Sequence, residues 1–177
     1  MLERQRRSGA RACPLGERGF TVVQLVITIA IISVVSTFAV MGIARARSSM
    51  RLSASERELA AYLEQARADS IRRHAEVPDD AGDPDTRATI TLPAAGGTTY
   101  TVRMDFDKDG TIDDARTIPL QSGVSFSTDA NMIVFDWRGR TVDAVEIGLV
   151  NDRGDTSTIV ITGAGDITLN SEAFRDG

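Results

Sequence analysis

An uninterrupted run of uncharged residues near the start of the chain constrains its fold more than any other feature. The run covers the 25 residues from Phe20 to Ala44, and Arg45 and Arg47 end it. A helix of this length reaches roughly 37 Å at about 1.5 Å per residue, enough to cross a bilayer core of about 30 Å. The Ser and Thr residues in the run can return hydrogen bonds to helix carbonyls, so lipid tolerates them. We therefore expect this segment to enter a membrane.

Charge is distributed unevenly along the 177 residues. Residues 1–19 contain five arginines and two glutamates, a net charge of +3, whereas residues 75–177 carry a net charge of −11. A basic flank next to a span favours a cytoplasmic N-terminus, which would place the acidic part of the chain outside the cytoplasm. Residues 45–74, also at +3, weaken this assignment because they form the other flank. Cys13 is the only cysteine, so no disulfide can stabilise the distal domain.

Beyond the span, the pattern predicts that the helix continues to about residue 75. Leu52, Leu59 and Leu63 recur at helical spacing and give the helix one apolar face. We expect the helix to stop at Val77 and Pro78, since a proline disfavours helical geometry in the residue before it.

After a loop at residues 79–86, the period changes to short apolar runs separated by Gly and Asp turn signals. These runs predict eight strands, at Ala88–Leu92, Thr98–Phe106, Arg116–Leu120, Val124–Ser127, Met132–Trp137, Thr141–Val150, Ser157–Thr162 and Ile167–Asn170. Short turns between neighbouring strands favour antiparallel pairing. The expected fold class is α+β, with one long helix, transmembrane in its first half and amphipathic in its second, packed on a small antiparallel β domain.

These features divide the chain into four segments. We expect a cytoplasmic leader at 1–19, a transmembrane and assembly helix at 20–44, an amphipathic continuation at 45–77 and an antiparallel β domain at 78–177.

Gly19, Phe20 and Thr21, followed directly by the apolar helix, resemble the class III signal of type IV pilins and type II secretion pseudopilins. The resemblance implies that a prepilin peptidase cuts after Gly19 and methylates the new N-terminus at Phe20. It also implies a single-pass protein of the bacterial inner membrane, with a cytoplasmic N-terminus and a periplasmic domain. Such a chain is later assembled with other pilins or pseudopilins into a type II secretion pseudopilus or a type IV pilus, and it is not an enzyme.

Four later segments resemble, in order, parts of the minor pseudopilin H / FimT group. They are Ala66–Val77, Met104–Asp113, Ile133–Arg140 and Thr158–Gly163. Each piece is short, and their order along the chain gives the resemblance its weight.

Gln24 departs from this resemblance, because the family usually has glutamate as the fifth mature residue. That glutamate is thought to pair with the N-terminal amine of a neighbouring subunit, and a charge in an apolar bundle is costly unless it is paired. Glutamine offers a hydrogen bond without the charge, which would weaken docking onto an earlier subunit. One hypothesis is therefore a position at the filament tip, and the other is that glutamine is tolerated in a rare minor component.

Four aspartates match the start of a calcium-binding loop. Asp105, Asp107, Asp109 and Asp113 occupy its positions 1, 3, 5 and 9, with a glycine at position 6. Position 12, normally a bidentate glutamate, is Arg116. The alternative is an Asp-Gly hairpin turn with solvated carboxylates, so the sequence leaves calcium as a possible ligand and predicts no other cofactor.

The remaining residues point away from catalysis and nucleic acid. The chain has no Ser nucleophile motif and no His/Cys set at metal spacing. DNA affinity depends on basic contacts to phosphate, and the distal segment is strongly acidic, although Arg138, Arg140 and Arg153 could form a local basic patch. The alternative to a filament subunit is therefore a membrane-anchored extracytoplasmic module that binds calcium, DNA or a secreted substrate.

Overall fold

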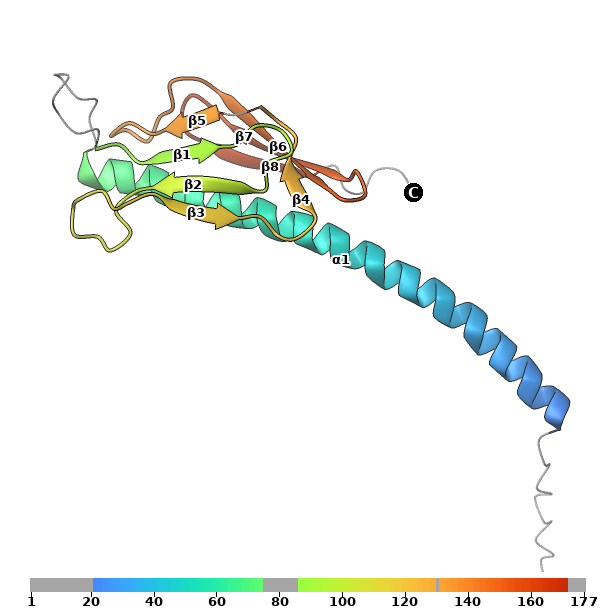
Figure 1. The fold of residues 1–177 in the computed structure, drawn as a ribbon. Helices are drawn as coiled ribbons and strands as arrows, with labels where there is room; N and C mark the ends of the chain where they lie inside the picture. Colours follow the sequence, from blue (N-terminus) through green and yellow to red (C-terminus); the bar gives the residue numbers. More distant parts are fainter. Residues whose placement is uncertain (1–20, 75–85, 130, 172–177) are drawn as a thin grey trace, which may run out of the picture. The chain divides into compact units, whose positions relative to one another are not determined.

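The computed structural model describes residues 21–74, 86–129 and 131–171. Within these ranges one helix, α1 (Val22–Arg73), precedes eight strands (Figure 1). The strands are β1 (Thr89–Leu92), β2 (Thr99–Arg103), β3 (Arg116–Pro119), β4 (Val124–Phe126), β5 (Asn131–Val134), β6 (Val145–Asn151), β7 (Thr156–Ile161) and β8 (Ile167–Ser171). The chain divides into two compact units, residues 1–41 and residues 42–177, and each is considered by itself.

The described part of the first unit is the apolar beginning of α1, and all of its side chains are exposed. By length and composition α1 contains a segment able to cross a membrane. The expected return of side-chain hydrogen bonds to the helix is confirmed. The hydroxyl of Thr28 donates to the carbonyl of Gln24, that of Ser33 to Ile29 at 2.8 Å and that of Thr37 to Ser33 at 2.9 Å. These hydroxyl groups therefore need no water.

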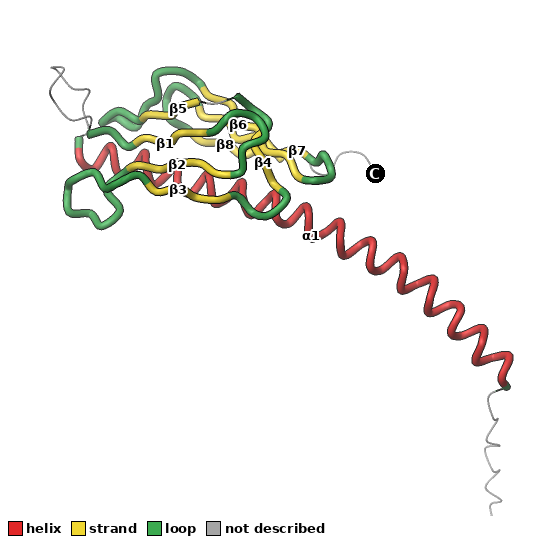
Figure 2. The backbone as a smooth tube through the Cα atoms, viewed as in Figure 1, coloured by secondary structure: helices red, strands yellow, loops and turns green. Residues whose placement is uncertain are grey.

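The second unit contains two four-stranded sheets in which all described pairs are antiparallel. The first has the order β3-β2-β1-β5 and the second the order β4-β6-β7-β8. The longest ladder, β6 against β7, runs from Val145 opposite Ile161 to Val150 opposite Thr156. In Figure 2 the strands of this unit gather along the C-terminal half of α1.

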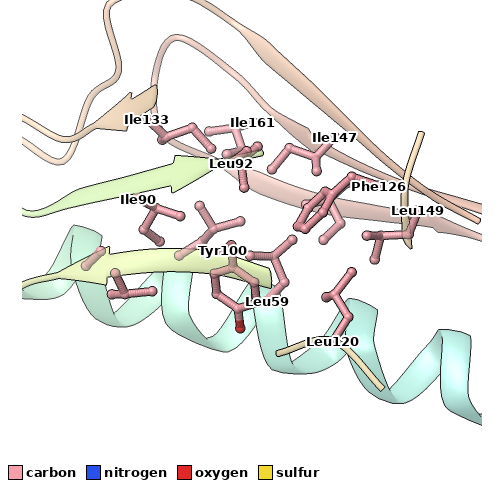
Figure 3. Packing of buried hydrophobic residues seen from close by; sticks show 14 of the residues in the cluster. Leu59, Ile90, Leu92, Tyr100, Leu120, Phe126, Ile133, Ile147, Leu149 and Ile161 are labelled. Carbon is pink, nitrogen blue, oxygen red and sulfur yellow. The ribbon is translucent and has the colours of Figure 1, made fainter. Parts of the chain in front are cut away.

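The core of the second unit lies between α1 and the two sheets. Leu52, Leu59 and Leu63 of α1 are almost completely buried, as their helical spacing predicts. Figure 3 shows Leu59 beside Tyr100 of β2, and the Tyr100 ring meets Phe126 of β4 edge to face at 6.2 Å. Each such buried side chain contributes about 1.5–3 kcal/mol to folding, so the helix face and the strand faces stabilise one another.

The α+β fold class is confirmed, and each expected strand is found, but three are shorter than expected by two or more residues. β5 ends at Val134 rather than Trp137, because the Asp136 carboxylate closes a turn by accepting the N–H groups of Arg138 (2.9 Å) and Arg140 (2.8 Å). β2 ends at Arg103 rather than Phe106, because Asp105 turns away from the ladder to accept hydrogen bonds. β6 begins at Val145 rather than Thr141, because the Thr141 hydroxyl donates to the carbonyls of Asp143 (2.8 Å) and Thr162 (3.1 Å) and so closes a turn.

The end of α1 also differs slightly from the expected one. The helix stops at Arg73, and His74 follows in the left-handed region with φ of 50°. A left-handed residue after the last helical turn is a common helix stop, here made without glycine. The expected stop at Val77 and Pro78 lies outside the described residues.

Candidate functional site

The start of α1 carries a helix cap that includes Gln24. Thr21 precedes the first helical residue, and its hydroxyl oxygen accepts the backbone N–H of Gln24 at 3.3 Å. The carbonyl of Thr21 accepts the N–H of Leu25 at 3.2 Å, which is the first helical hydrogen bond. A Thr followed three residues later by Gln has the spacing of a capping box.

The sequence argument missed this cap, although the Thr-x-x-Gln spacing could have revealed it. Gln24 takes part in it through its backbone N–H. The bond from the Gln24 side chain back to the Thr21 N–H, which would complete a capping box, is not among the hydrogen bonds of the described residues. Gly19 and Phe20, the predicted cleavage and methylation site, lie outside the described residues.

The predicted calcium loop connects β2 to β3 and lies near the C-terminal end of α1 (Figure 1). Its first carboxylate, Asp105, is 5% exposed and accepts four hydrogen bonds. Three come from the loop backbone, at Lys108 (2.6 Å), Asp109 (3.2 Å) and Gly110 (2.9 Å). The fourth comes from the Arg72 guanidinium of α1 at 2.5 Å.

Asp69 is a second buried carboxylate at the same place, and it comes from the helix. It accepts hydrogen bonds from Arg72 at 2.8 Å and from Arg73 at 2.6 Å. It also accepts the backbone N–H of Asp105 at 3.2 Å. Two buried carboxylates and two guanidinium groups therefore hold the loop against the last turn of α1, with charges that balance.

These contacts lower the pKa of both carboxyl groups. Burial alone would raise the pKa of Asp105, but the hydrogen bonds from Arg72, Gly110 and Lys108 outweigh it and bring the pKa to about 2. Burial would likewise raise the pKa of Asp69, but the hydrogen bonds from Arg73 and Arg72 outweigh it, so this pKa is also lowered. Both groups are charged throughout the physiological pH range.

The other aspartates of the loop shape its backbone. Asp109 accepts the N–H of Thr111 at 2.8 Å and the hydroxyl of Thr111 at 2.7 Å. The bond from the hydroxyl is the largest of the effects that lower the pKa of Asp109. Asp113 accepts the N–H of Phe106 at 2.7 Å. The backbone of Lys108 has φ of 66°, a conformation that residues other than glycine rarely adopt.

The geometry brings together three of the four predicted calcium ligands. One carboxylate oxygen each from Asp105, Asp107 and Asp109 lies within 4.8 Å of the others. Asp113 does not belong to this group, because its carboxylate caps the loop backbone instead. The Arg72 guanidinium already bonds the Asp105 carboxylate. The first of the clustered carboxylates is thus already paired with a cation of the chain, and calcium binding stays a prediction.

Comparisons with known proteins gave one kind of match. No family model matches the chain, and no curated protein matches it. Two crystal structures of the type IV minor pilin FimU of Pseudomonas aeruginosa (strain PAO1), in space groups P21 and P65, are similar to it. Both matches have 16% sequence identity and cover 67% of this chain. The match to the P21 structure covers 87% of the FimU chain with a TM-score of 0.46, and the match to the P65 structure covers 92% with a TM-score of 0.45. The likeness is distant, so the fold described above rests on the elements of this chain alone.

Proposed function

We propose that this chain is a pilin-like subunit that is anchored and assembled through the apolar part of α1. The observation that carries the proposal is the contrast along this helix. Residues 22–47 are exposed and largely apolar, whereas Leu52, Leu59 and Leu63 are buried in the α+β domain. An exposed apolar helix of this length needs lipid or other helices to cover it. In a subunit that moves from a membrane into a bundle of such helices, lipid covers the apolar helix first and neighbouring helices cover it afterwards.

Processing after Gly19 is the first part of the proposal. Cleavage there would make Phe20 the methylated first residue and would leave Thr21 in place to cap α1. Co-expression with a prepilin peptidase, followed by N-terminal sequencing, tests this: we expect a mature protein that starts at N-methylated Phe20. Gly19→Trp should remain uncut, and Gly16→Trp is the control that should be cut. A mature protein that starts at another residue would contradict the proposal.

Localisation follows from the basic leader. We propose a single pass through the bacterial inner membrane, with residues 1–19 cytoplasmic and the domain periplasmic, before entry into a type II secretion pseudopilus or a type IV pilus. Cys13, the only cysteine, reports the side of the leader. A membrane-impermeant thiol reagent added to spheroplasts that contain the uncut Gly19→Trp chain should label Cys13 only after lysis. Labelling of intact spheroplasts would reverse the assigned topology.

Gln24 suggests a place in the filament. After cleavage a positive amine would stand at the N-terminus of α1, where the helix dipole is also positive, and glutamine supplies no charge to neutralise a neighbour's amine. A subunit at the tip has no earlier subunit to dock onto, so it does not need that charge. We expect Gln24→Glu to increase incorporation at internal positions. Gln65→Glu adds the same charge at an exposed site on the same helix and is the control. Equal incorporation of wild type and Gln24→Glu would remove this assignment.

A second candidate function is a membrane-anchored calcium-binding module, and the clustered oxygens of Asp105, Asp107 and Asp109 favour it. Calcium would have to compete with Arg72 for Asp105. If the module binds calcium, millimolar calcium should raise the thermal midpoint of the wild-type chain but not that of Asp107→Asn/Asp109→Asn. No shift and no heat in a calorimetric titration would exclude this candidate.

A further inference from the structure

The residues of α1 that follow its apolar part are basic and exposed. Arg45 and Arg47 come directly after the uncharged run, and Arg51 follows one turn later, all three with exposed side chains. The next acidic residue of the helix is Glu56. In the part of the chain that the structure describes, none of these three arginines takes part in an ion pair.

The fold adds a fourth arginine at this end of the second unit. The Ser48 hydroxyl donates to the carboxylate of Asp152 at 2.5 Å, which places the β6–β7 turn beside the helix. Arg153, the next residue of that turn, is exposed. Arg51 in turn donates to the carbonyl of Ser122 at 3.4 Å, before β4. We refer to Arg45, Arg47, Arg51 and Arg153 as the basic collar.

The two acidic side chains of the β6–β7 turn, Asp152 and Asp155, offset the charge of the collar only in part. The Asp152 carboxylate accepts the Ser48 hydroxyl. Asp155 accepts the side-chain amide of Asn151 at 2.7 Å. Both carboxylates stay negative when they accept bonds from these neutral donors, so four arginines against two carboxylates leave an excess of two positive charges. The exposed guanidinium groups can bind an external anion through two parallel N–H donors.

The spacing along α1 fits the thickness of a lipid headgroup layer. From Val22 to Ala44 the helix rises about 34 Å, slightly more than a bilayer core of about 30 Å. From Arg45 to Arg51 it rises about 9 Å, while the headgroup layer on each side is about 5–8 Å thick. When the apolar part spans the core, the helical arginines of the collar lie at the depth of the phosphates.

We propose that the basic collar binds the phosphates of anionic phospholipids in the leaflet where the chain leaves the membrane. The inference rests on the membrane anchor of the proposed function and names the lipid that the anchor prefers. Phosphate binding gives a role to basic residues on the flank opposite the leader, where an orientation signal would not need them. It also fixes the depth of the subunit until the helix leaves the lipid.

The experiment uses the full chain reconstituted into phosphatidylcholine bilayers. Trace amounts of spin-labelled phosphatidylglycerol or phosphatidylcholine then report which lipid is motionally restricted by the protein. We expect a preference for phosphatidylglycerol, which 0.5 M salt weakens because it shortens the Debye length to several ångströms. In Arg45→Gln/Arg47→Gln/Arg51→Gln the preference should fall by up to roughly fivefold for each arginine removed.

The matched control removes the same charge elsewhere. Arg57→Gln/Arg138→Gln/Arg140→Gln changes three exposed arginines outside the collar and keeps the leader arginines unchanged. It should retain the wild-type preference. Equal loss in both triple variants, or no loss in the collar variant, overturns the inference while leaving the anchor intact. Absence of any restricted lipid would show that the chain is not inserted, and it would overturn the membrane anchor together with the collar.

Discussion

At the scale of single residues, Asp105 has the most informative environment in the described structure. Its carboxylate joins the β2–β3 loop to α1 through Arg72 and also organises the loop through three backbone N–H groups. A carboxylate with so many donors prefers its charged form, which explains why its pKa falls to about 2 despite burial. Asp105, the first residue of the aspartate cluster that resembles a metal site, therefore also holds the loop against α1.

This environment predicts an acid-dependent loss of stability. Asp105 and Asp69 have lower pKa values in the folded chain than the ordinary value of 3.8. Their contribution to stability is therefore complete above about pH 5 and is lost as the pH falls towards 2, where Asp105 becomes protonated in the folded state. Asp105→Asn should lower the thermal midpoint at pH 7 and flatten its decline between pH 5 and pH 2.

Thermal unfolding measured across this pH range checks the prediction. Asp114→Asn, an exposed aspartate of the same loop, is the control and should follow the wild-type curve. If Asp105→Asn declined as steeply as wild type, the ion pair with Arg72 would not contribute to the acid sensitivity.

At the scale of elements, two glycine turns pack against each other and against α1. Gly139 and Gly165 both have positive φ, of 72° and 85°, and a Cβ on Gly165 would overlap the carbonyl oxygen of Gly139. Arg67 donates to the same carbonyl oxygen at 3.1 Å and lies 3.8 Å from the Asp166 carboxylate. The turns after β5 and β7 thus meet at one residue of the helix.

Gly165→Ala should therefore destabilise the domain through both strain and overlap. We expect a loss of roughly 2–4 kcal/mol in the free energy of unfolding. Gly154→Ala isolates the strain, since Gly154 has φ of 86° with open space around it, and should cost about 1 kcal/mol. Chemical unfolding followed by the fluorescence of Trp137 measures both. Equal losses would show that the contact with Gly139 is not tight.

The sequence predicts each strand but not how the strands pair. Alternating apolar residues and Gly or Asp turns locate a strand locally, and they also explain the apolar face of α1. The pairing of β1 with β5 and of β4 with β6 joins segments that are distant along the chain, which no local pattern specifies. Likewise, the partner of Asp105 is Arg72, which lies 33 residues earlier. The aspartate spacing alone therefore suggested a metal site.

At the scale of the whole molecule, the core belongs to one unit. Among the described residues, the core cluster begins at Leu52 and ends at Ile161, within residues 42–177. The described residues of the first unit, from Thr21 to Met41, are all exposed and bury no side chain in that core. The residues of α1 up to Met41 therefore add no side chain to the core of the domain.

A chain that starts at Gly42 should consequently fold without residues 1–41. We expect its thermal midpoint to equal that of the full chain in detergent, because the described residues among those removed, from Thr21 to Met41, make no contact with the core. Leu59→Ala in the same background should cost about 2–5 kcal/mol, since it leaves a cavity between α1 and β2. A truncated chain that stays unfolded would show that the anchor is part of the fold. Independent folding would instead let the helix exchange lipid for neighbouring helices while the domain keeps its structure, as the proposed filament subunit requires.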